Sequence, residues 1–566
     1  MEYEKLFNTE NDLMDEESRK IEEKVDYYLS GIINSRFDYI VDFVELKRII
    51  KQLPNNKSNG YSGISNEMIK YCCNDHFIEI LGEMFQIIFN RGVIPKNFNV
   101  GKIIPILKNN KGANNIITNV RPITVSDTIS VIFEKYMLLQ MNKKIKENKA
   151  QLGFTENGST QHGVFVIKEV VNYYVQNGGR IYSCAVDASK AFDKVWRMGL
   201  FAKLIDTLGP AEFRALYNYY FDSWCYIEVN GEKSKLFKTG AGVKQGGPLS
   251  PKLYNIYVVS LIDEIEELKV GARVNDSLIS IIIYADDIML ISPTRKGLEL
   301  MVNKVSEYMT TWKIKMNADK TNYMVFGKEV VVDNGIFIGK DRIERVTMIK
   351  YLGVYIDDKL RLAQHQSEKT KQLLKSTYSL YSIGLMNNCM DVTTKSYIYK
   401  TYCRPILTYG WEFLETSEKT IKTMRTDECK CLKRILGVQK TAKNSLVYNA
   451  LEITEPLNQI YVMKVKFSER LEKNELTRNL LKNLNVMFDL NELKTNSIVN
   501  DMKNLELKLG SHNLVNNVIK TYQEDDKLNI KNDGLIDSIR YCLNNRTKNF
   551  NLYKILYHLI SGYIIR

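Results

Sequence analysis

Two short apolar runs with acidic residues between them form the sharpest pattern along the chain. Residues 281–284 (Ile-Ile-Ile-Tyr) and 288–291 (Ile-Met-Leu-Ile) are β-branched, aromatic or long apolar side chains, which predicts two short β-strands. Asp286 and Asp287 lie between the runs and predict a hairpin turn. Charges at the centre of so short a stretch argue against a membrane span. Adjacent carboxylates in an apolar setting repel each other unless a cation neutralises them, so the pattern predicts a metal ion; a solvated turn is the alternative.

The N-terminal part of the chain has mainly helical spacing. Apolar residues three and four positions apart predict helices within residues 1–48 and 65–90, and a turn-rich loop is expected at 54–63. Short strands are predicted in 102–124, followed by a helix through Lys135.

The C-terminal part changes pattern once. Residues 182–353 alternate between strand-like and helix-like spacing, and every acidic motif discussed below lies there. Beyond Asp358 the spacing is almost entirely helical, with interruptions expected at Pro405, Gly410 and Gly437. The whole chain is therefore expected to be α+β with a mainly helical C-terminal region.

Length and charge fit a large intracellular protein with a polyanionic partner. The 566 residues are 44% hydrophobic, enough for several domains with their own cores. The formal net charge is +13, and Lys359 to Lys440 holds 15 Lys and Arg against 7 Asp and Glu. A helical segment this basic is a candidate for binding a phosphate backbone. The first twenty residues lack the basic-then-apolar pattern of a secretion signal, so we expect a location inside the cell.

A second acidic element lies about a hundred residues before the first. Asp187 ends the apolar run 182–186, which predicts a strand. Taken alone, such an aspartate is more often a helix cap. Beside a carboxylate hairpin it can instead help to hold two divalent ions, which activate the attacking oxygen and stabilise the leaving oxygen of a phosphoryl transfer. Hard oxygen ligands favour Mg²⁺, and Mn²⁺ could replace it.

These elements resemble a known polymerase family. Asp187 with 191–193 (Ala-Phe-Asp), 246–251 (Gly-Gly-Pro-Leu-Ser-Pro) and 284–287 (Tyr-Ala-Asp-Asp) resemble motifs A, B and C of reverse transcriptases. Flanking segments resemble the non-LTR (LINE-type) retrotransposon subgroup: 56–64, 120–123, 151–154, 351–354 and 399–410. The resemblance runs in the family's order from about Leu46 to Val438.

The resemblance implies a right-hand polymerase fold with fingers, a palm built on an antiparallel sheet, and a helical thumb. The expected segments are an N-terminal helical extension (1–45), fingers (46–180), palm with motifs A to E (181–357), basic thumb (358–450) and a helical C-terminal region of unknown role (451–566).

The resemblance also assigns roles to single residues. Asp187, Asp286 and Asp287 would be the catalytic carboxylates and the ligands of two metal ions. Phe192 would exclude a 2′-hydroxyl and so select deoxynucleotides, although a core phenylalanine is the alternative. The other residues expected to bind the nucleotide are Gln245, Arg121, Lys108 and Lys320, and those expected to position template and primer are Gly246, Gly247, Tyr351, Leu352 and Gly353.

The implied activity is RNA-directed DNA synthesis from a primer 3′-hydroxyl. Its partners would be template RNA, a DNA primer, deoxynucleoside triphosphates and a nicked chromosomal target, with no membrane; its location would be the nucleus or the cytoplasm. Two alternatives stay open: a group II intron or retron-like reverse transcriptase, and a non-catalytic RNA-binding protein derived from a retroelement. Relatives of this type usually carry an endonuclease, and no signature of one is recognisable in this sequence.

Overall fold

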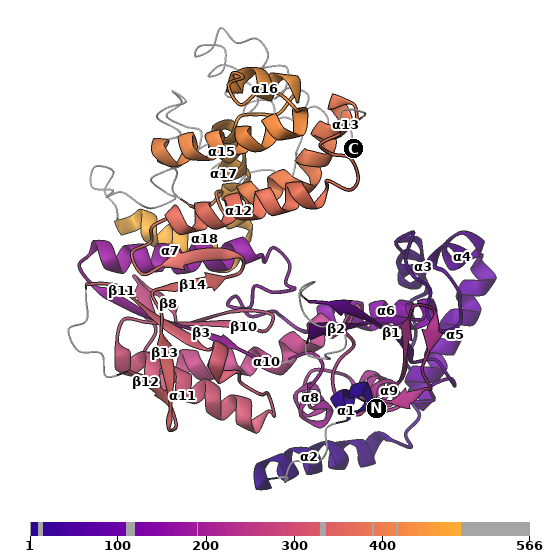
Figure 1. Ribbon diagram of the computed structural model, residues 1–566. Coiled ribbons are helices and arrows are strands. Elements are labelled where there is room, and N and C mark those ends of the chain that lie inside the picture. Colours follow the sequence, from indigo (N-terminus) through magenta and orange to yellow (C-terminus); the bar gives the residue numbers. More distant parts are fainter. Residues whose placement is uncertain are drawn as a thin grey trace.

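The computed structural model describes residues 2–8, 15–108, 119–188, 191–328, 335–387, 390–414 and 417–487 (Figure 1). Of the helical C-terminal region predicted for 451–566, residues 488–566 therefore lie outside the described part. The N-terminal helices α1 (Glu2–Phe7) and α2 (Glu16–Ile32) do not form a separate unit. Helix α2 packs against α8 (Arg197–Leu204) and α9 (Pro210–Phe221), and Leu6 and Phe7 of α1 are buried beside Ile103 and Cys225.

A mixed sheet with helices beside it forms the part expected to be the fingers. Strands β1 (Val100–Leu107) and β2 (Val120–Ser126) pair antiparallel, and β4 (Trp224–Val229) joins β1 in parallel. The short strands β5 (Glu232–Lys233) and β6 (Phe237–Lys238) pair with β4. The helices of this part are α3 (Phe43–Lys51), α4 (Asn66–Cys72), α5 (Asp75–Arg91) and α6 (Thr128–Lys144). Strand β4 thus lies with the fingers strands, although the sequence places its residues within the palm segment 181–357.

The central sheet has six strands in the order β12-β13-β11-β3-β10-β9. Their bounds are β3 (Arg180–Asp187), β9 (Ile281–Tyr284), β10 (Asp287–Ser292), β11 (Asn322–Gly327), β12 (Ile336–Ile338) and β13 (Asp341–Arg345). Helices α10 (Ser250–Glu267) and α11 (Arg295–Thr311) lie on one face and α7 (Thr160–Gln176) on the other (Figure 1).

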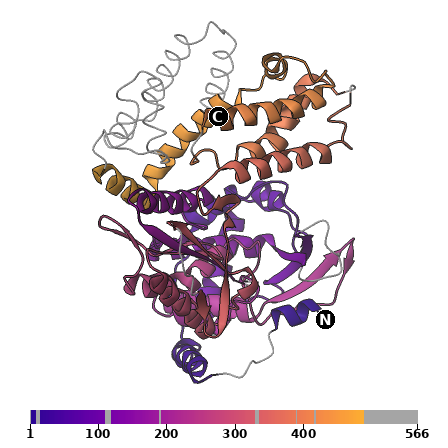
Figure 2. The same cartoon turned by 60° about the vertical axis from the view of Figure 1, so that its left-hand side comes forward.

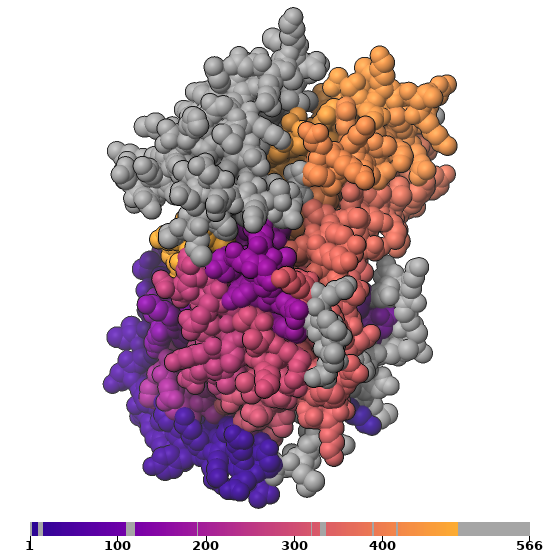
Figure 3. Space-filling model, turned by 90° about the vertical axis from the view of Figure 1, so that its left-hand side faces the viewer, coloured from indigo at the N-terminus to yellow at the C-terminus, as the bar shows by residue number. Residues whose placement is uncertain are grey.

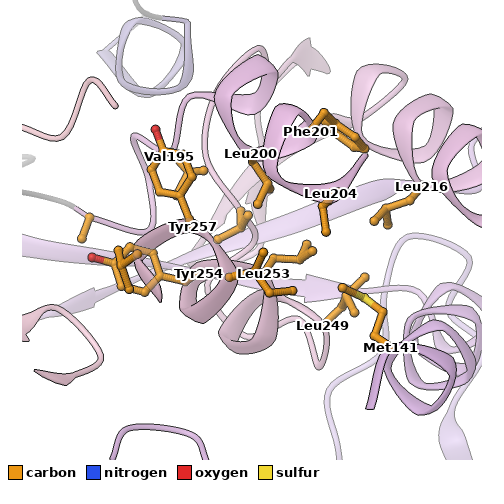
Figure 4. Close-up of a cluster of buried hydrophobic side chains, with 14 of the residues drawn as sticks. Met141, Val195, Leu200, Phe201, Leu204, Leu216, Leu249, Leu253, Tyr254 and Tyr257 are labelled. Carbon is orange, nitrogen blue, oxygen red and sulfur yellow. The ribbon is translucent and has the colours of Figure 1, made fainter. Parts of the chain in front are cut away.

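Both faces of this sheet are buried, and this explains why its strands read as continuous apolar runs. Ile281, Ile283 and Ile288 belong to the core formed with α10 and α11, whereas Ile282 and Met289 belong to the core formed with α7. A sheet covered on both sides needs apolar residues at every position, whereas a one-sided sheet would show alternation. Helix α10 is held in turn by α8: Leu253 and Tyr257 pack among Leu200, Leu204 and their neighbours (Figure 4).

The described residues between Asp358 and Met487 are mainly helical, as predicted. Their helices are α12 (Ala363–Ser379), α13 (Val392–Ile398), α14 (Arg404–Thr408), α15 (Glu418–Leu436), α16 (Asn444–Ala450), α17 (Pro456–Lys473) and α18 (Glu475–Met487). They share a core with α7, and α18 lies against α7 (Figure 2). In the space-filling view the helices α15 to α17 (orange) and the N-terminal helix α2 (indigo) lie at opposite ends, with the part of the chain that holds the central sheet (magenta to pink) between them (Figure 3).

The interruption expected at Pro405 is not a break. Helices α13 and α14 are joined by a π-helical turn, Tyr399–Cys403, so the chain stays helical through Pro405. A proline in a helix removes one N–H and crowds the carbonyl four residues earlier, and a π-turn widens the helix enough to accommodate it. The interruptions at Gly410 and Gly437 are present, because both glycines have left-handed backbones and Gly437 ends α15.

Two small hairpins complete the described part: β7 (Ala272–Val274) with β8 (Ser277–Ile279), and β14 (Met348–Tyr351) with β15 (Val354–Asp357). Among the described helices, none combines the length and the apolar character that crossing a lipid bilayer requires.

Candidate active site

The acidic pair lies at the predicted hairpin, but its two members occupy different positions. Because Tyr284 pairs with Asp287, the turn consists of Ala285 and Asp286, and Asp287 is the first residue of β10. Ala285 has a left-handed backbone (φ 57°), as two-residue hairpins favour, at a cost of about 1 kcal/mol or more for a residue with a side chain. Gly153 packs directly on this turn: a Cβ added to it would lie 2.3 Å from the Ala285 nitrogen.

Strand β3 brings Asp187 to the same end of the sheet. Asp187 is its last residue and pairs in register with Asp287 of β10, so both side chains point to the face that carries α7. The Nδ2 of Asn317 donates a hydrogen bond to Asp187 Oδ2 (3.1 Å), and Lys320 Nζ lies 3.5 Å from the same oxygen. The structure therefore brings together the three carboxylates that the sequence singled out, and adds Asn317 to them.

Negative charge at this site is held at an energetic cost. Burial, followed by the nearby charges of Asp286 and Asp187, raises the pKa of Asp287 from 3.8 to about 6. The pKa of Asp286 is also raised, mainly by burial and then by Asp187, while Arg121 and Lys320 oppose the increase. Each carboxylate thus disfavours ionisation of its neighbours, and cations relieve the repulsion.

The strands around the acidic pair are buried, but the pair itself is accessible to water. Asp286 and Asp287 each expose part of their surface to water, although protein atoms crowd the rest and raise their pKa values, whereas the neighbouring Ile283 and Ile288 are buried. The expectation of carboxylates enclosed by an apolar run is corrected accordingly: protein surrounds them only in part. Among the described residues, no three His, Cys, Asp or Glu side chains gather closely enough to hold a metal ion as they stand. The nearby donors are hard carboxylate and amide oxygens, the type that Mg²⁺ binds.

Phe192 lies between two other aromatic rings. It stacks on Tyr254 of α10, with ring centroids 4.6 Å apart and planes 19° apart. Phe154 meets it edge to face, with centroids 6.0 Å apart and planes at 79°. The Phe192 carbonyl accepts a hydrogen bond from the Val243 amide (2.9 Å). Phe192 itself is half-buried, so its ring is held on the protein side and partly free on the other.

The glycine-rich loop that begins at Gln245 fits closely between Asp193 on one side and strand β2 and helix α6 on the other. The side-chain Nε2 of Gln245 donates to Asp193 Oδ1 (2.7 Å), and the backbone carbonyl of Gln245 accepts from the backbone N–H of Thr124 on β2 (2.7 Å). Gly246 has a left-handed backbone (φ 111°), and a Cβ there would lie 2.9 Å from the Thr124 oxygen. A Cβ on Gly247 would lie 2.8 Å from an oxygen of Glu134 on α6. Both glycines are therefore needed for close packing of this loop.

A buried arginine supports the segment that leads into this loop. Arg197 donates to the carbonyls of Gly242 (3.1 Å), Tyr220 (2.5 Å), Thr239 (2.5 Å) and Ala241 (3.2 Å). Burial lowers its pKa to about 10, which still leaves the guanidinium charged at neutral pH. Arg197 thus fixes four backbone carbonyls by a single side chain.

The expected phosphate-binding cations lie in and after the fingers strands. Arg121 is exposed on β2, opposite Ile106 of β1, and lies near enough to lower the pKa of Asp286. Lys108 is exposed directly after β1, and its amide donates to the Asn119 carbonyl (2.8 Å). Arg121 is therefore grouped with the carboxylates.

The expected primer-positioning residues form the tip of the β14–β15 hairpin. Tyr351 pairs with Val354, so Leu352 (φ 45°) and Gly353 (φ 82°) make a two-residue turn with two left-handed residues. The Tyr351 ring is buried, and burial and then Asp287 raise the pKa of its hydroxyl, which places the tip beside the carboxylates. Tyr409 OH donates to the Leu352 carbonyl (2.8 Å) and thereby ties this turn to the thumb.

His365 reinforces the same junction. Its Nδ1 accepts from the Tyr355 amide (3.3 Å), so its Nε2 carries the proton and donates to the Tyr409 carbonyl (3.1 Å). Burial lowers the pKa of His365 to about 4, so the ring is neutral at physiological pH.

Sequence reasoning assigned no role to several residues that shape the site. Asn317 lies three residues before Lys320, and Gly153 and Phe154 lie in the segment 151–154 (Gln-Leu-Gly-Phe), whose resemblance to the family assigns no role to either residue. The signal in the latter was a glycine next to an aromatic residue, which indicates close backbone packing. Arg197 and His365 carry no local signal, since their partners lie far away in the sequence.

Comparison with known proteins identifies the central part of the chain. Residues 106–356 match the family "Reverse transcriptase (RNA-dependent DNA polymerase)". The chain is 24% identical over 458 residues to the RNA-directed DNA polymerase from mobile element jockey of Drosophila melanogaster, a match that covers 78% of this chain and 49% of that protein. It is 26% identical over 244 residues to the Pol polyprotein of the retrotransposable element R2DM of the same fly, covering 41% of this chain and 23% of that protein.

The chain spans about half the length of the jockey relative that it matches. Among solved structures, an apo telomerase from Candida tropicalis aligns with 12% identity and a TM-score of 0.34, covering 63% of this chain and 93% of that one. Residues 106–356 therefore form a reverse transcriptase domain, and the chain is distantly related to the RNA-directed DNA polymerases of non-LTR mobile elements.

Proposed function

We propose that this protein copies the RNA of a non-LTR retrotransposon into DNA, extending a primer 3′-hydroxyl by two-metal nucleotidyl transfer. The observation that carries the proposal is the register of β3 and β10, which sets Asp187 opposite Asp287 beside the Ala285–Asp286 turn, within the matched domain. Residues a hundred positions apart thereby present carboxylates at one end of one sheet.

Asp187, Asp286 and Asp287 would hold the divalent cations, Mg²⁺ or in its place Mn²⁺. When bound, two such ions supply activation of the attacking hydroxyl and stabilisation of the leaving oxygen. Burial and the repulsion between the carboxylates together raise the pKa of Asp286 and Asp287, and this supports the assignment because bound cations would relieve both effects. Lys320 lies close enough to Asp187 to neutralise it, and in the reaction it would face the leaving pyrophosphate.

The nucleotide would lie between the carboxylates and the fingers strands. Arg121 and Lys108 would bind its triphosphate, which Arg121 can do with two parallel hydrogen bonds. The Phe192 ring would exclude a 2′-hydroxyl. Gln245 would contact the new base pair, with its amide oriented by Asp193.

Template and primer would be positioned by the two glycine-containing turns. Gly246 and Gly247 allow the loop to approach a base pair closely, and the Tyr351–Leu352–Gly353 tip would hold the primer end. The thumb would follow the product duplex through its backbone. Support for this comes from exposed cations on α12 and α15, among them Lys371, Lys375, Lys422 and Lys430.

We keep the segment boundaries of the sequence interpretation, with fingers at 46–180, palm at 181–357 and thumb at 358–450, as part of the proposal. The partners would be template RNA, a DNA primer, deoxynucleoside triphosphates and a nicked chromosomal target. The reaction would take place inside the cell, in the nucleus or the cytoplasm, where such partners occur.

Primer extension on poly(rA)/oligo(dT) with dTTP and Mg²⁺ tests the proposal on the full-length chain. We expect Asp286→Ala to abolish extension while retention of labelled template in a gel-shift assay stays within about twofold of wild type. The matched control is Asp276→Ala, which removes an exposed aspartate from the β7–β8 turn of the same domain and should leave extension unchanged. Folded wild-type protein that binds template but extends no primer would instead support a non-catalytic RNA-binding role.

A further inference from the structure

Phe154 is a large apolar side chain in an unfavourable place. The residue is 54% exposed, and its backbone is left-handed (φ 58°), a conformation that bulky residues seldom adopt. Such a backbone costs about 1–3 kcal/mol and persists only where the surroundings impose it. Neither burial of the ring nor backbone preference explains why a phenylalanine lies here.

The backbone of Phe154 is fixed by the segment just before it. The Leu152 amide donates to the Ile283 carbonyl of β9 (2.8 Å), which attaches the segment to the edge of the central sheet. Gly153 lies against Ala285, and its carbonyl accepts from Asn255 Nδ2 of α10 (2.9 Å). Phe154 is therefore anchored to the turn that bears Asp286 and to the helix that bears Tyr254.

The ring of Phe154 contacts one functional residue, Phe192. Tyr254 stacks on one face of the Phe192 ring, and the Phe154 ring contacts Phe192 in an edge-to-face arrangement. A ring held on two sides cannot turn away when a substituent presses on it. With Phe154 removed, Phe192 would keep its stacking partner but gain freedom to swing sideways.

We propose that Phe154 is a specificity-determining positioning residue: it holds the Phe192 ring in the orientation that excludes a 2′-hydroxyl. The inference rests on the proposed function, because it presumes that Phe192 faces the sugar of the incoming nucleotide. The Phe192 ring can exclude ribonucleotides only if it is not displaced by the 2′-hydroxyl. Selection of deoxynucleotides therefore depends on Phe154, which holds the ring, as well as on the ring itself. An edge-to-face aromatic pair contributes enough to change a ratio of rates by about 3–10-fold.

Single-nucleotide insertion on poly(rA)/oligo(dT) with dUTP or UTP, which differ only at the 2′ position, tests this inference. We expect Phe154→Ala to lower the dUTP/UTP ratio of kcat/KM by about 3–10-fold, through faster UTP insertion. The conservative variant Phe154→Tyr keeps an aromatic ring and should keep the wild-type ratio. In a Phe192→Ala background, Phe154→Ala should change the ratio no further. Phe337→Ala, which truncates an exposed phenylalanine on β12 of the same sheet, is the matched control and should leave the ratio unaltered.

The possible failures are distinguishable. An unchanged ratio in Phe154→Ala, or equal losses for both nucleotides, overturns the inference while Phe192→Ala still relaxes selection. If Phe192→Ala does not relax selection either, the sugar-excluding role of Phe192 falls and the inference falls with it. Wild-type protein that inserts neither nucleotide contradicts the proposed function itself. Because Phe154 is exposed, we expect its substitution to leave the Tm unchanged, which separates loss of selection from misfolding.

Discussion

Replacing Gly153 by alanine tests whether the position of the Ala285–Asp286 turn controls the rate of DNA synthesis. The added Cβ would lie 2.3 Å from the Ala285 nitrogen and 3.0 Å from the Tyr284 carbonyl carbon, whereas ordinary contacts begin at 3.4 Å. Both neighbours are backbone atoms, so the turn itself must move, by about 1 Å at the closest contact. Gly153 is not in the left-handed region, so steric overlap is the only new strain.

The expected effect follows from that displacement. Overpacking of this size costs about 1–3 kcal/mol of stability. A shift of about 1 Å in a catalytic group can lower its rate about 100-fold, and Asp286 moves with the turn. We therefore expect Gly153→Ala to lower kcat for dTTP incorporation by about 10- to 100-fold, with template affinity within about twofold of wild type.

The assay is single-turnover incorporation on poly(rA)/oligo(dT), accompanied by a gel shift for template binding and a thermal melt. Gly31→Ala is the matched control, because nothing lies within 4 Å of a Cβ added to that glycine, which lies in helix α2. Alanine there should leave kcat unchanged and raise helix stability by up to about 1 kcal/mol. A Gly153→Ala enzyme that keeps its rate within about threefold of wild type would show that the turn tolerates movement, and the reasoning would be wrong.

Three further predictions concern charge and support. The pKa of Asp287 in the folded protein, about 6, lies above its ordinary value of 3.8, so ionisation of this carboxyl group destabilises the fold at higher pH. Asp287→Asn should therefore raise the Tm at pH 8 in Mg²⁺-free buffer. This gain in Tm should shrink as the pH falls to 5. The exposed Asp341→Asn is its control, and a gain that does not depend on pH would contradict the prediction. Arg197→Lys should lower the free energy of unfolding by at least about 2 kcal/mol in a urea titration, because a single ammonium group cannot satisfy four carbonyls. A change under about 0.5 kcal/mol would show that these four hydrogen bonds do not stabilise the fold. Tyr409→Phe removes the bond to the Leu352 carbonyl and should cost about 1 kcal/mol and raise the KM for primer; an unchanged KM would separate this bond from primer positioning.

Much of the site could be predicted from the sequence because its chemistry is local. The apolar runs on either side of Asp286 and Asp287 specify two strands and a turn, and the structure confirms both strands. The helices predicted beyond Asp358 are likewise confirmed as far as Met487, where the described residues end, since period and length determine a helix without long-range information. The expected break at Pro405 failed because a π-turn is a small adjustment of the helix that leaves no mark on apolar spacing.

Register and support were decided by tertiary structure. The sequence could suggest that Asp187 meets the hairpin, but in a sheet buried on both faces every position is apolar, so no alternation reveals which residues pair. The pairing of Asp187 with Asp287 is set by packing against α7, α10 and α11. The same holds for β4, which lies beside β1 although more than a hundred residues separate them.

The sequence by itself thus indicated which groups we propose to carry the chemistry: three carboxylates, a phenylalanine, a glycine-rich loop and a basic helical segment. Only the folded chain decided how they are held, with Phe192 between Tyr254 and Phe154, and Gly153 against the turn of Asp286. The physical reason is that side-chain type is a local property. Orientation depends on contacts between residues far apart in the chain, and many sequences of the same pattern could make such contacts in different ways.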